Sequence, residues 1–244
     1  MKKIWLGIAV LVVFGIIGTA WWVSRSLDSQ LVSAIRTYGS QVAGVPVSLS
    51  NARIVVADGT ATLRGLVVGN PQGFKTPYAL SLAEIRLTLD IGSLTRDVIR
   101  IKEIAIFKPD VIYEYALGGS NLDVIQRNAE RYVAAHLGGT RETAQAEPGK
   151  KLVIEHVSIK NGTVNVSADM LKGKAMVVPL PDLQLKDIGK QSNGATVGEA
   201  MKRIFGALTQ GVTASVSSLK LGHVVDSLKK GAGAATDAIK GLFK

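Results

Sequence analysis

The sequence has no cysteine and only three histidines among its 244 residues. Without cysteine there is no disulfide framework, no thiolate nucleophile and no cysteine-based zinc site. The histidines, His136, His156 and His223, lie far apart in the sequence, which argues against a histidine metal site. Aromatic residues make up only 5% of the chain although 47% of it is hydrophobic, so the apolar residues are mainly aliphatic.

Familiar catalytic and nucleotide-binding motifs are missing as well. The sequence contains no G-x-S-x-G nucleophile elbow, no Walker loop and no G-x-G-x-x-G after a strand. The neighbouring carboxylates Asp110, Glu114 and Asp123 are typical of turns, caps and solvated strand faces. We therefore expect neither an enzyme activity nor a cofactor. The net charge of +10 comes without the basic and aromatic clusters of nucleic-acid binding, so an anionic membrane surface is the better partner.

The longest uncharged stretch runs from Ile4 to Ser24. A helix of about 20 apolar residues spans a bilayer, so this stretch predicts a transmembrane helix. Lys2 and Lys3 precede it, which puts the N-terminus in the cytoplasm, and Trp21 and Trp22 suit the far membrane interface. A cleaved signal peptide is the alternative, because Gly-Thr-Ala at 18–20 fits a cleavage site. Either way, everything after Arg25 is expected outside the cytoplasm.

Changes in periodicity divide the chain into five parts. These are an anchor at 1–25, a membrane-proximal helix at 26–45, a β-rich domain at 46–188, a linker at 189–198 and an amphipathic helical tail at 199–244. Within the β-rich domain a helix is expected at 121–137, where Ser120 and Asp123 resemble a capping box, followed by a linker at 138–151.

The β-rich domain alternates apolar and polar residues, as from Ile85 to Ile91, so one face of its sheet is apolar. A one-residue slip of this alternation at Glu103 indicates a β-bulge. We expect a mainly β fold with flanking helices (α+β), in which a curved antiparallel β-meander forms an open groove.

One spacing of apolar residues recurs three times in the strands. The first two copies are Ile54-x-Val56-x-x-Gly59 and Val157-x-Ile159-x-x-Gly162. They predict hairpins with two-residue turns at Asp58-Gly59 and Asn161-Gly162, so that position 56 faces position 61. The third copy, Ile104-x-Ile106-x-x-Pro109, has proline in the glycine position and predicts a bend between strands.

The helical tail carries two apolar stripes on different sides of the helical wheel, which predicts a break near 221–222. The first stripe consists of Met201, Phe205, Leu208, Val212, Val216 and Leu219. The second half is basic and contains glycines, and its apolar side needs a membrane, the β-domain or a partner to cover it. Its candidate contact residues are Leu221, Val225, Leu228, Lys229, Lys230, Ile239 and Lys240.

Several short motifs occur in a recognisable order along residues 1–190. They include Leu63-Arg-Gly-Leu-Val-Val-Gly-Asn70-Pro71-Gln-Gly73-Phe74, Gly118-Gly-Ser-Asn121-Leu122 and Leu180-Pro-Asp-Leu183. Together with the N-terminal anchor, this series resembles the AsmA-like family of bacterial envelope proteins. The Asn-Pro pair with its flanking strands is also similar to the water-stress (LEA type 2) domain.

The AsmA resemblance implies an inner-membrane anchor and a periplasmic β-domain. In larger relatives this domain is a long β-groove related to chorein-type bridge-like lipid transfer proteins, along which acyl chains move. About ten strands spaced by about 4.8 Å would give a sheet of only about 50 Å. A single copy of this chain is therefore too short for a complete bridge across a periplasm.

We therefore predict a single-pass inner-membrane protein, mostly periplasmic, that binds or helps transfer lipid. Its expected partners are membrane lipids, other envelope proteins or a second copy, and not nucleic acid. The residues expected to line the groove are Ile54, Val56, Leu63, Val67, Leu87, Leu89, Ile99, Ile101, Ile104, Ile106, Val157, Ile159, Val164 and Val166. The alternative is a non-catalytic scaffold of an envelope complex that docks through its tail, with the apolar face closed by helices as a core.

Overall fold

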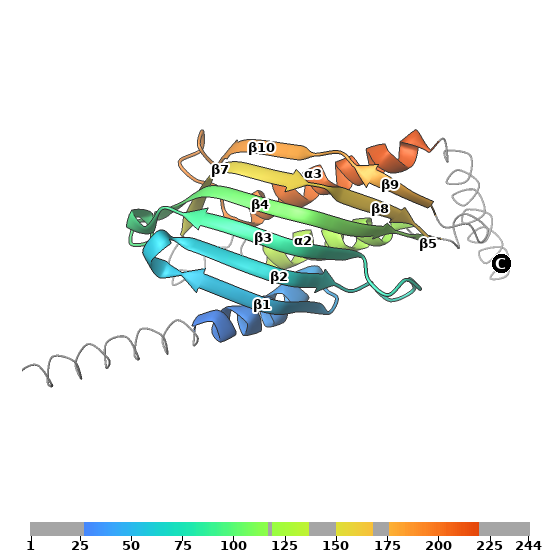
Figure 1. The fold of residues 1–244 in the computed structure, drawn as a ribbon, viewed down its shortest axis with the longest axis horizontal. Coiled ribbons are helices and arrows are strands. Elements are labelled where there is room, and N and C mark those ends of the chain that lie inside the picture. The colour runs from blue at the N-terminus through green and yellow to red at the C-terminus, as the bar shows by residue number, and fades with distance from the viewer. Residues whose placement is uncertain (1–26, 117–118, 137–149, 168–175, 220–244) are drawn as a thin grey trace, which may run out of the picture.

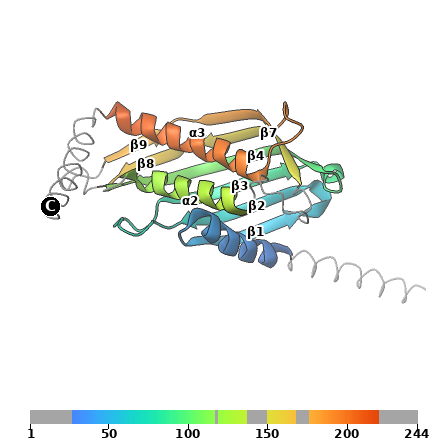
Figure 2. The same cartoon turned by 180° about the vertical axis from the view of Figure 1, so that it is seen from behind.

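The computed structural model describes residues 27–116, 119–136, 150–167 and 176–219. These residues form an eight-stranded sheet with helices on one face (Figures 1 and 2). The strands of the sheet are β1 (Val47–Val55), β2 (Thr60–Val68), β3 (Leu80–Leu89), β4 (Val98–Tyr113), β7 (Lys151–Lys160), β8 (Gly162–Val166), β9 (Met176–Leu180) and β10 (Leu183–Ile188). Two short strands, β5 (Tyr115–Ala116) and β6 (Gly119–Ser120), pair with each other. The prediction of a mainly β fold with flanking helices is confirmed.

The centre of the sheet contains parallel strands. β1 to β4 are antiparallel neighbours in sequence order. β7 and β8 instead both run parallel to β4, one beside each half of it, and β10 and β9 complete the sheet antiparallel to them. The predicted antiparallel meander is therefore wrong at β4. Alternation in a strand shows which face is apolar, but it does not show which strand lies beside it.

Asn161-Gly162 continues the direction of the strand instead of forming the predicted hairpin turn. β7 and β8 continue in one direction along β4, with Phe107 beside Lys160 and Asp110 beside Thr163. Asn161 has a left-handed backbone with φ 58°, and Lys108 at the same level of β4 has φ 48°. The second hairpin prediction is therefore wrong, and the third copy of the repeat lies inside the continuous strand β4. Asn-Gly signals a left-handed backbone, which a hairpin turn uses but which here occurs between two strands that run in one direction.

The first predicted hairpin is present at Asp58-Gly59, with a different register. A short 3-10 helix, η1 (Val56–Asp58), precedes Gly59, whose φ is 63°. Ile54 pairs with Ala61, where a two-residue turn would have paired Val56 with Ala61. The loop is thus longer than predicted, and Val56 belongs to the turn.

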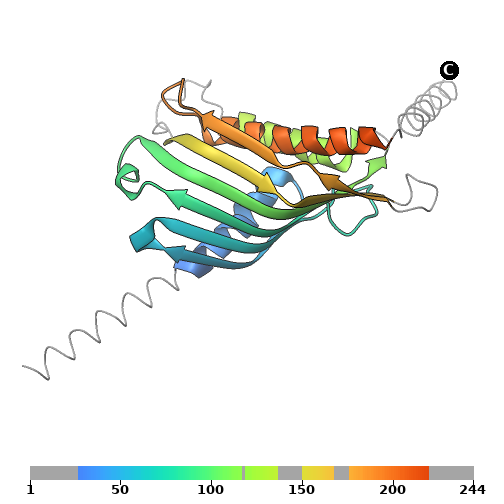
Figure 3. The ribbon, with the colours of Figure 1, turned by 45° about the horizontal axis from the view of Figure 1, so that its top comes forward.

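Two lines of irregular backbone cross the sheet. The first passes through the left-handed residues Gly65 of β2 (φ 64°), Lys108 and Asn161, and the register between neighbouring strands is the same on its two sides. At the second line, the register between β3 and β4 shifts between Thr88 and Leu89. This shift lies opposite Glu103, so the bulge predicted there is confirmed. At the first line the alternation slips by one residue, so apolar residues such as Leu63 and Leu66 are three apart. The strands are visibly curved along their length (Figure 3).

Three helices lie on one face of the sheet (Figure 2): one at 27–43, α2 (Asn121–His136) and α3 (Val197–Ser218). The capping box predicted at the start of α2 is confirmed. The Ser120 amide donates to Asp123 Oδ2 at 3.0 Å, and the Asp123 amide donates to Ser120 Oγ at 3.1 Å. α3 begins with a second box, in which the Thr196 amide donates to Glu199 Oε2 at 2.8 Å and the Glu199 amide to Thr196 Oγ1 at 3.2 Å.

Within the described residues, no helix combines the length and the apolar character needed to cross a membrane. The predicted anchor at 1–25, most of the linker at 138–151 and the predicted break near 221–222 lie outside those residues.

Candidate functional site

Aliphatic side chains form rows across the helix-facing side of the sheet, with one residue from each strand beside its register partner on the next. Row 1 consists of Ala52, Leu63, Ile85, Ile106, Ile159 and Leu183. Row 2 consists of Ile54, Ala61, Leu87, Ile104, Val157 and Leu185. Row 2 lies closer to one end of the sheet, which is formed by η1, η2 (Ile91–Ser93) and the loop at 189–196 and is called the η1–η2 end below.

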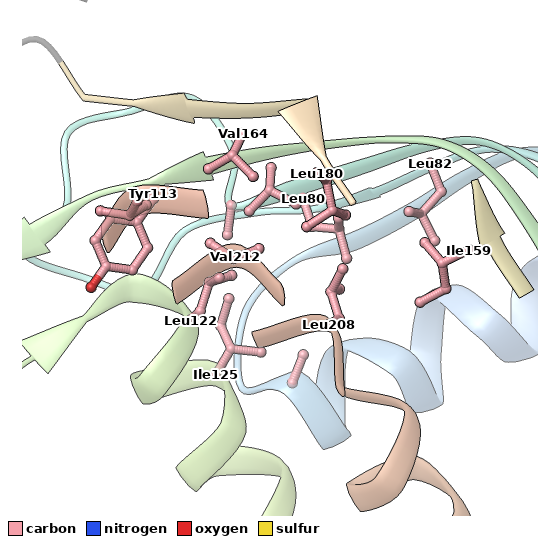
Figure 4. Packing of buried hydrophobic residues seen from close by; sticks show 14 of the residues in the cluster. Leu80, Leu82, Tyr113, Leu122, Ile125, Ile159, Val164, Leu180, Leu208 and Val212 are labelled. Carbon is pink, nitrogen blue, oxygen red and sulfur yellow. The ribbon is translucent and has the colours of Figure 1, made fainter. Parts of the chain in front are cut away.

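Three hydrophobic clusters hold the helices on this face. α2 and α3 pack on the first cluster, the start of α3 on the second and the helix at 27–43 on the third. The main helix residues of the clusters are Leu122, Ile125, Leu208, Val212 and Val216 in the first, Ala200 and Ile204 in the second, and Leu31, Val32 and Ile35 in the third. Figure 4 shows Leu208 and Val212 of α3 and Leu122 of α2 among sheet residues such as Leu80 and Val164.

Coverage of the apolar face is lower along row 2 than toward either end of the sheet. Val111 and Val164, near one end, are both 0% exposed, and Ile154 and Ile188, beyond row 2 toward the η1–η2 end, are 2% and 1% exposed. In row 2 only Val157 is buried, and the other members are half-buried. Leu87 packs against the third cluster and its register partner Ile104 against the second. The half-buried part of row 2 therefore crosses the boundary between two helix-covered regions.

The opposite face of the sheet is polar. Arg64 and Arg86 contact the Glu84 carboxylate at 2.8 and 2.6 Å, and these contacts, mainly the hydrogen bond from Arg64, hold the pKa of Glu84 below 4.5. A depression of about 430 Å³ lies beside the bulge between β3 and β4, and its lining includes Lys102 and Glu103. These mixed charges make the depression unsuitable for a hydrocarbon chain.

A buried polar network holds the loop at 69–79, at the end opposite η1 and η2. Asn121 is 0% exposed, and its Nδ2 donates to Asn70 Oδ1 at 2.9 Å and to the Ile112 carbonyl at 2.7 Å. The Glu114 carboxylate, 5% exposed, accepts from the Lys75 amide and from the amide and hydroxyl of Thr76 at 2.7–3.1 Å. These bonds satisfy the polar groups within the protein, so the network positions the loop.

Asp110 joins strands on the polar face. Its carboxylate accepts from the Tyr78 hydroxyl at 2.7 Å, from the Thr163 hydroxyl at 2.8 Å and from Asn165 Nδ2. The hydrogen bond to Asp110 raises the pKa of Tyr78 above 10.0. Across the described ranges, no group of three or more His, Cys, Asp or Glu side chains is placed to hold a metal ion.

The sequence model of the AsmA family matches residues 60–235, more than two thirds of the chain. This chain belongs to the AsmA family. The match begins at β2 and covers every later strand together with α2 and α3. Membership of the AsmA family indicates an envelope-related function. No curated protein matches the chain in sequence.

Most residues predicted to line the groove lie on the helix-facing side of this AsmA-family sheet. Those packed in the three clusters are Leu63, Leu87, Leu89, Ile101, Ile104, Ile106, Val157, Ile159, Val164 and Val166. Ile54 belongs to row 2, and Ile99 lies half-buried beside Leu152 of β7. Their contact with lipid stays a prediction.

Val56 and Val67 lie elsewhere. Val56 is 54% exposed in the turn η1, because the first hairpin has the longer loop. Val67 stands between Leu66 and Val68, which both pack on the first cluster, so its side chain points to the polar face. The left-handed backbone at Gly65 causes this difference, because the alternation slips by one residue there, after Leu63.

The first half of the predicted tail packs on the sheet as α3. Of its apolar stripe, all members except Met201 join the first cluster, and Met201 is 38% exposed. The tail residues predicted to contact a membrane or partner, Leu221, Val225, Leu228, Lys229, Lys230, Ile239 and Lys240, lie outside the described residues.

The predicted lining did not include Ala61 and Leu185 of row 2, and sequence reasoning missed the network around Glu114. The alternation in β2 and β10 could have identified Ala61 and Leu185. Asn70 and Asn121 both belong to the motifs of the family resemblance, but their contact across 51 positions leaves no local signal.

Proposed function

We propose that this AsmA-family protein is anchored in the bacterial inner membrane, extends into the periplasm and binds lipid acyl chains along row 2. The observation that carries the proposal is the half-buried state of row 2 on a face that helices otherwise cover. An acyl chain gains about 0.8 kcal/mol for each methylene that it buries and needs no directional contact. A strip of aliphatic side chains is sufficient to hold it.

The route of the ligand follows from the geometry of the rows. Row 2 crosses the strands, so a chain bound there would lie across the sheet and not along one strand. The first residue of this row, Ile54, lies next to the start of the helix at 27–43, because the Ile54 amide donates to Asp28 Oδ1 at 2.8 Å. If residues 4–24 span the membrane, row 2 begins near the lipids of that membrane.

Photo-crosslinking tests this proposal in the full chain. Membranes would be supplied with a phospholipid that carries a diazirine in its acyl chain, irradiated, and the adducts mapped by mass spectrometry. We expect adducts at Leu87 and Ile104 and few on their polar-face neighbours Thr88 and Glu103. Equal labelling of the two faces would contradict lipid binding in row 2.

A matched pair of variants separates occupancy of row 2 from general membrane contact. Ala61→Trp places a bulky side chain in the half-buried row and should reduce the adducts at Leu87 several-fold. Ala83→Trp makes the same change at an exposed position of β3 and should leave them unchanged. Thermal unfolding of both variants would show that each is folded, and unchanged adducts in Ala61→Trp would contradict the proposal.

A further inference from the structure

Exposed large hydrophobic side chains gather at the η1–η2 end of the sheet. Val56 is 54% exposed, Ile91 and Leu94 are each 41% exposed, and Val197 is 43% exposed. Met201, one turn into α3, is 38% exposed. Isolated exposed apolar residues are normal on protein surfaces, but a group of them on neighbouring turns indicates an interaction surface.

Contacts between the turns make this end one continuous surface. A Cβ added at Gly59 would lie 2.8 Å from Ile91 Cγ1, so η1 and η2 touch. The Lys150 ammonium donates to the Leu94 carbonyl at 2.5 Å, and the Lys151 amide donates to the Asp97 carbonyl at 2.9 Å. Next to Lys151, the Leu152 amide donates to the Ala195 carbonyl at 2.8 Å, two residues before Val197.

The charges at this end suit a lipid headgroup layer, although apolar contact is the larger factor. Arg96, Lys150, Lys151 and Lys202 are exposed around the apolar turns. Lysine and arginine commonly lie at the headgroup level, with their aliphatic stems along apolar surface. Asp58 and Asp97 are exposed here too, so the net charge alone does not explain an association.

The chain outside the described residues connects to this same end. Asp28 accepts the Ile54 amide hydrogen, so the start of the helix at 27–43 lies beside η1. Only two residues lie between Ser24, the end of the uncharged stretch, and Leu27, so these two positions are at most about 11 Å apart. A membrane-spanning segment ending at Ser24 would therefore hold the η1–η2 end close to the bilayer surface.

We propose that the η1–η2 end docks on the surface of the lipid bilayer, with the side chains of Val56, Ile91, Leu94 and Val197 inserted at the headgroup boundary. This inference rests on the membrane anchor of the proposed function and adds to it a defined face and orientation. The strands then run away from the membrane, and row 2 lies closer to it than row 1 does. Interfacial insertion of this kind reaches about 5–10 Å into the bilayer.

The absence of native cysteine makes the proposal directly testable by site-specific labelling. Full-length Leu94→Cys and Val177→Cys would each carry an environment-sensitive NBD label in vesicles of phosphatidylcholine and phosphatidylglycerol. Val177, 64% exposed in β9 at the opposite end of the sheet, is the matched control. A nitroxide-headgroup lipid should quench the label at position 94 by more than half and leave the label at position 177 nearly unchanged.

A further variant tests whether apolar contact, and not the nearby anchor alone, holds this end down. In Val56→Cys, adding Ile91→Ser and Leu94→Ser should reduce quenching of the label at position 56 at least two-fold. Equal quenching at positions 94 and 177, or undiminished quenching in the serine variant, would overturn the docking proposal while leaving the anchor intact. A chain that does not float with the vesicles would overturn both the anchor and the docking.

Discussion

Glu114 is a buried carboxylate that accepts hydrogen bonds from a loop. It accepts three hydrogen-bond donors from Lys75 and Thr76, on a segment far from it in sequence. Hydrogen bonds to a charged group are worth about 1.5–3 kcal/mol each, so this single side chain determines much of the stability of the loop. In physical terms, Glu114 replaces the hydrogen bonds that a loop otherwise makes to water.

Glu114→Gln should therefore loosen this loop without changing the shape of the side chain. The NH₂ group of glutamine would face backbone N–H groups and cannot accept hydrogen bonds from them. At least one of these backbone donors would therefore be unpaired. We expect hydrogen exchange at the Lys75 and Thr76 amides to become about 10- to 100-fold faster, as a loss of about 1–3 kcal/mol predicts. Glu103→Gln, at an exposed position, is the control, and equal exchange in the two variants would disprove this role of Glu114.

Lys108 has a left-handed backbone that costs a non-glycine residue about 1–2 kcal/mol. Lys108→Gly should remove this cost and raise the free energy of unfolding by about 1 kcal/mol, measured by urea denaturation. Lys160→Gly is the matched control in the neighbouring strand β7, where a glycine should lower stability by about 0.5–1 kcal/mol. A loss of stability in both variants would contradict the strain at Lys108.

At the scale of the element, the start of α3 depends on the reciprocal bonds between Thr196 and Glu199. The hydrogen bond from the Thr196 backbone, followed by that from its side chain, lowers the pKa of Glu199 below 4.5. A carboxyl whose folded-state pKa is lowered contributes stability above its ordinary pKa, and this contribution is lost as the pH falls through the folded value. The first turn of α3 should therefore weaken in acid.

Thermal unfolding of the wild type and Glu199→Gln across the acidic range tests this expectation. The variant should be less stable near neutral pH and should lose less stability than the wild type below about pH 4.5. Thr196→Ala should cost about 1 kcal/mol at neutral pH, because it removes the other half of the cap. Parallel pH profiles of the wild type and Glu199→Gln would show that this carboxyl does not support the helix.

At the scale of the whole molecule, local signals predicted elements and faces but not distant neighbours. The capping box at Ser120 and the bulge near Glu103 depend on residues close together in sequence, and both are present. The pairing of β4 with β7 joins residues 53 positions apart, such as Ile104 and Val157, and depends on how α2 crosses the sheet. No local pattern of alternation contains that information.

The repeated spacing in the strands shows how a correct pattern led to a wrong structure. Its second and third copies lie side by side, and a Cβ added at Gly162 would lie 2.8 Å from Pro109 Cγ. Glycine and proline thus occupy equivalent places in adjacent parallel strands, whereas Gly59 closes a hairpin. A similar limit applies to the candidate site. Alternation predicted the aliphatic face, but its coverage depends on where α2 and the helix at 27–43 lie.

The helix at 27–43 links the whole sheet to the predicted anchor and closes one sheet edge. Asp28 Oδ1 accepts the Ile54 amide and Ser40 Oγ accepts the Val47 amide, both at 2.8 Å, so the edge strand β1 is bonded near its two ends. Unpaired amides on an edge strand favour association with another chain. The same contact places Ile54, the first residue of row 2, beside the start of the helix.

Asp28→Ala should therefore affect both the edge of the sheet and access to row 2. Loss of a hydrogen bond to a charged group should lower the free energy of unfolding by about 1.5–3 kcal/mol and speed hydrogen exchange at the Ile54 amide. The freed helix end should also expose more of row 2, so photo-lipid adducts at Leu87 should increase. Ser33→Ala, at an exposed position of the same helix, should change neither measurement. If exchange at Ile54 is the same in both variants, Asp28 does not hold the helix to the sheet, and the accessibility of row 2 is set by the other helices.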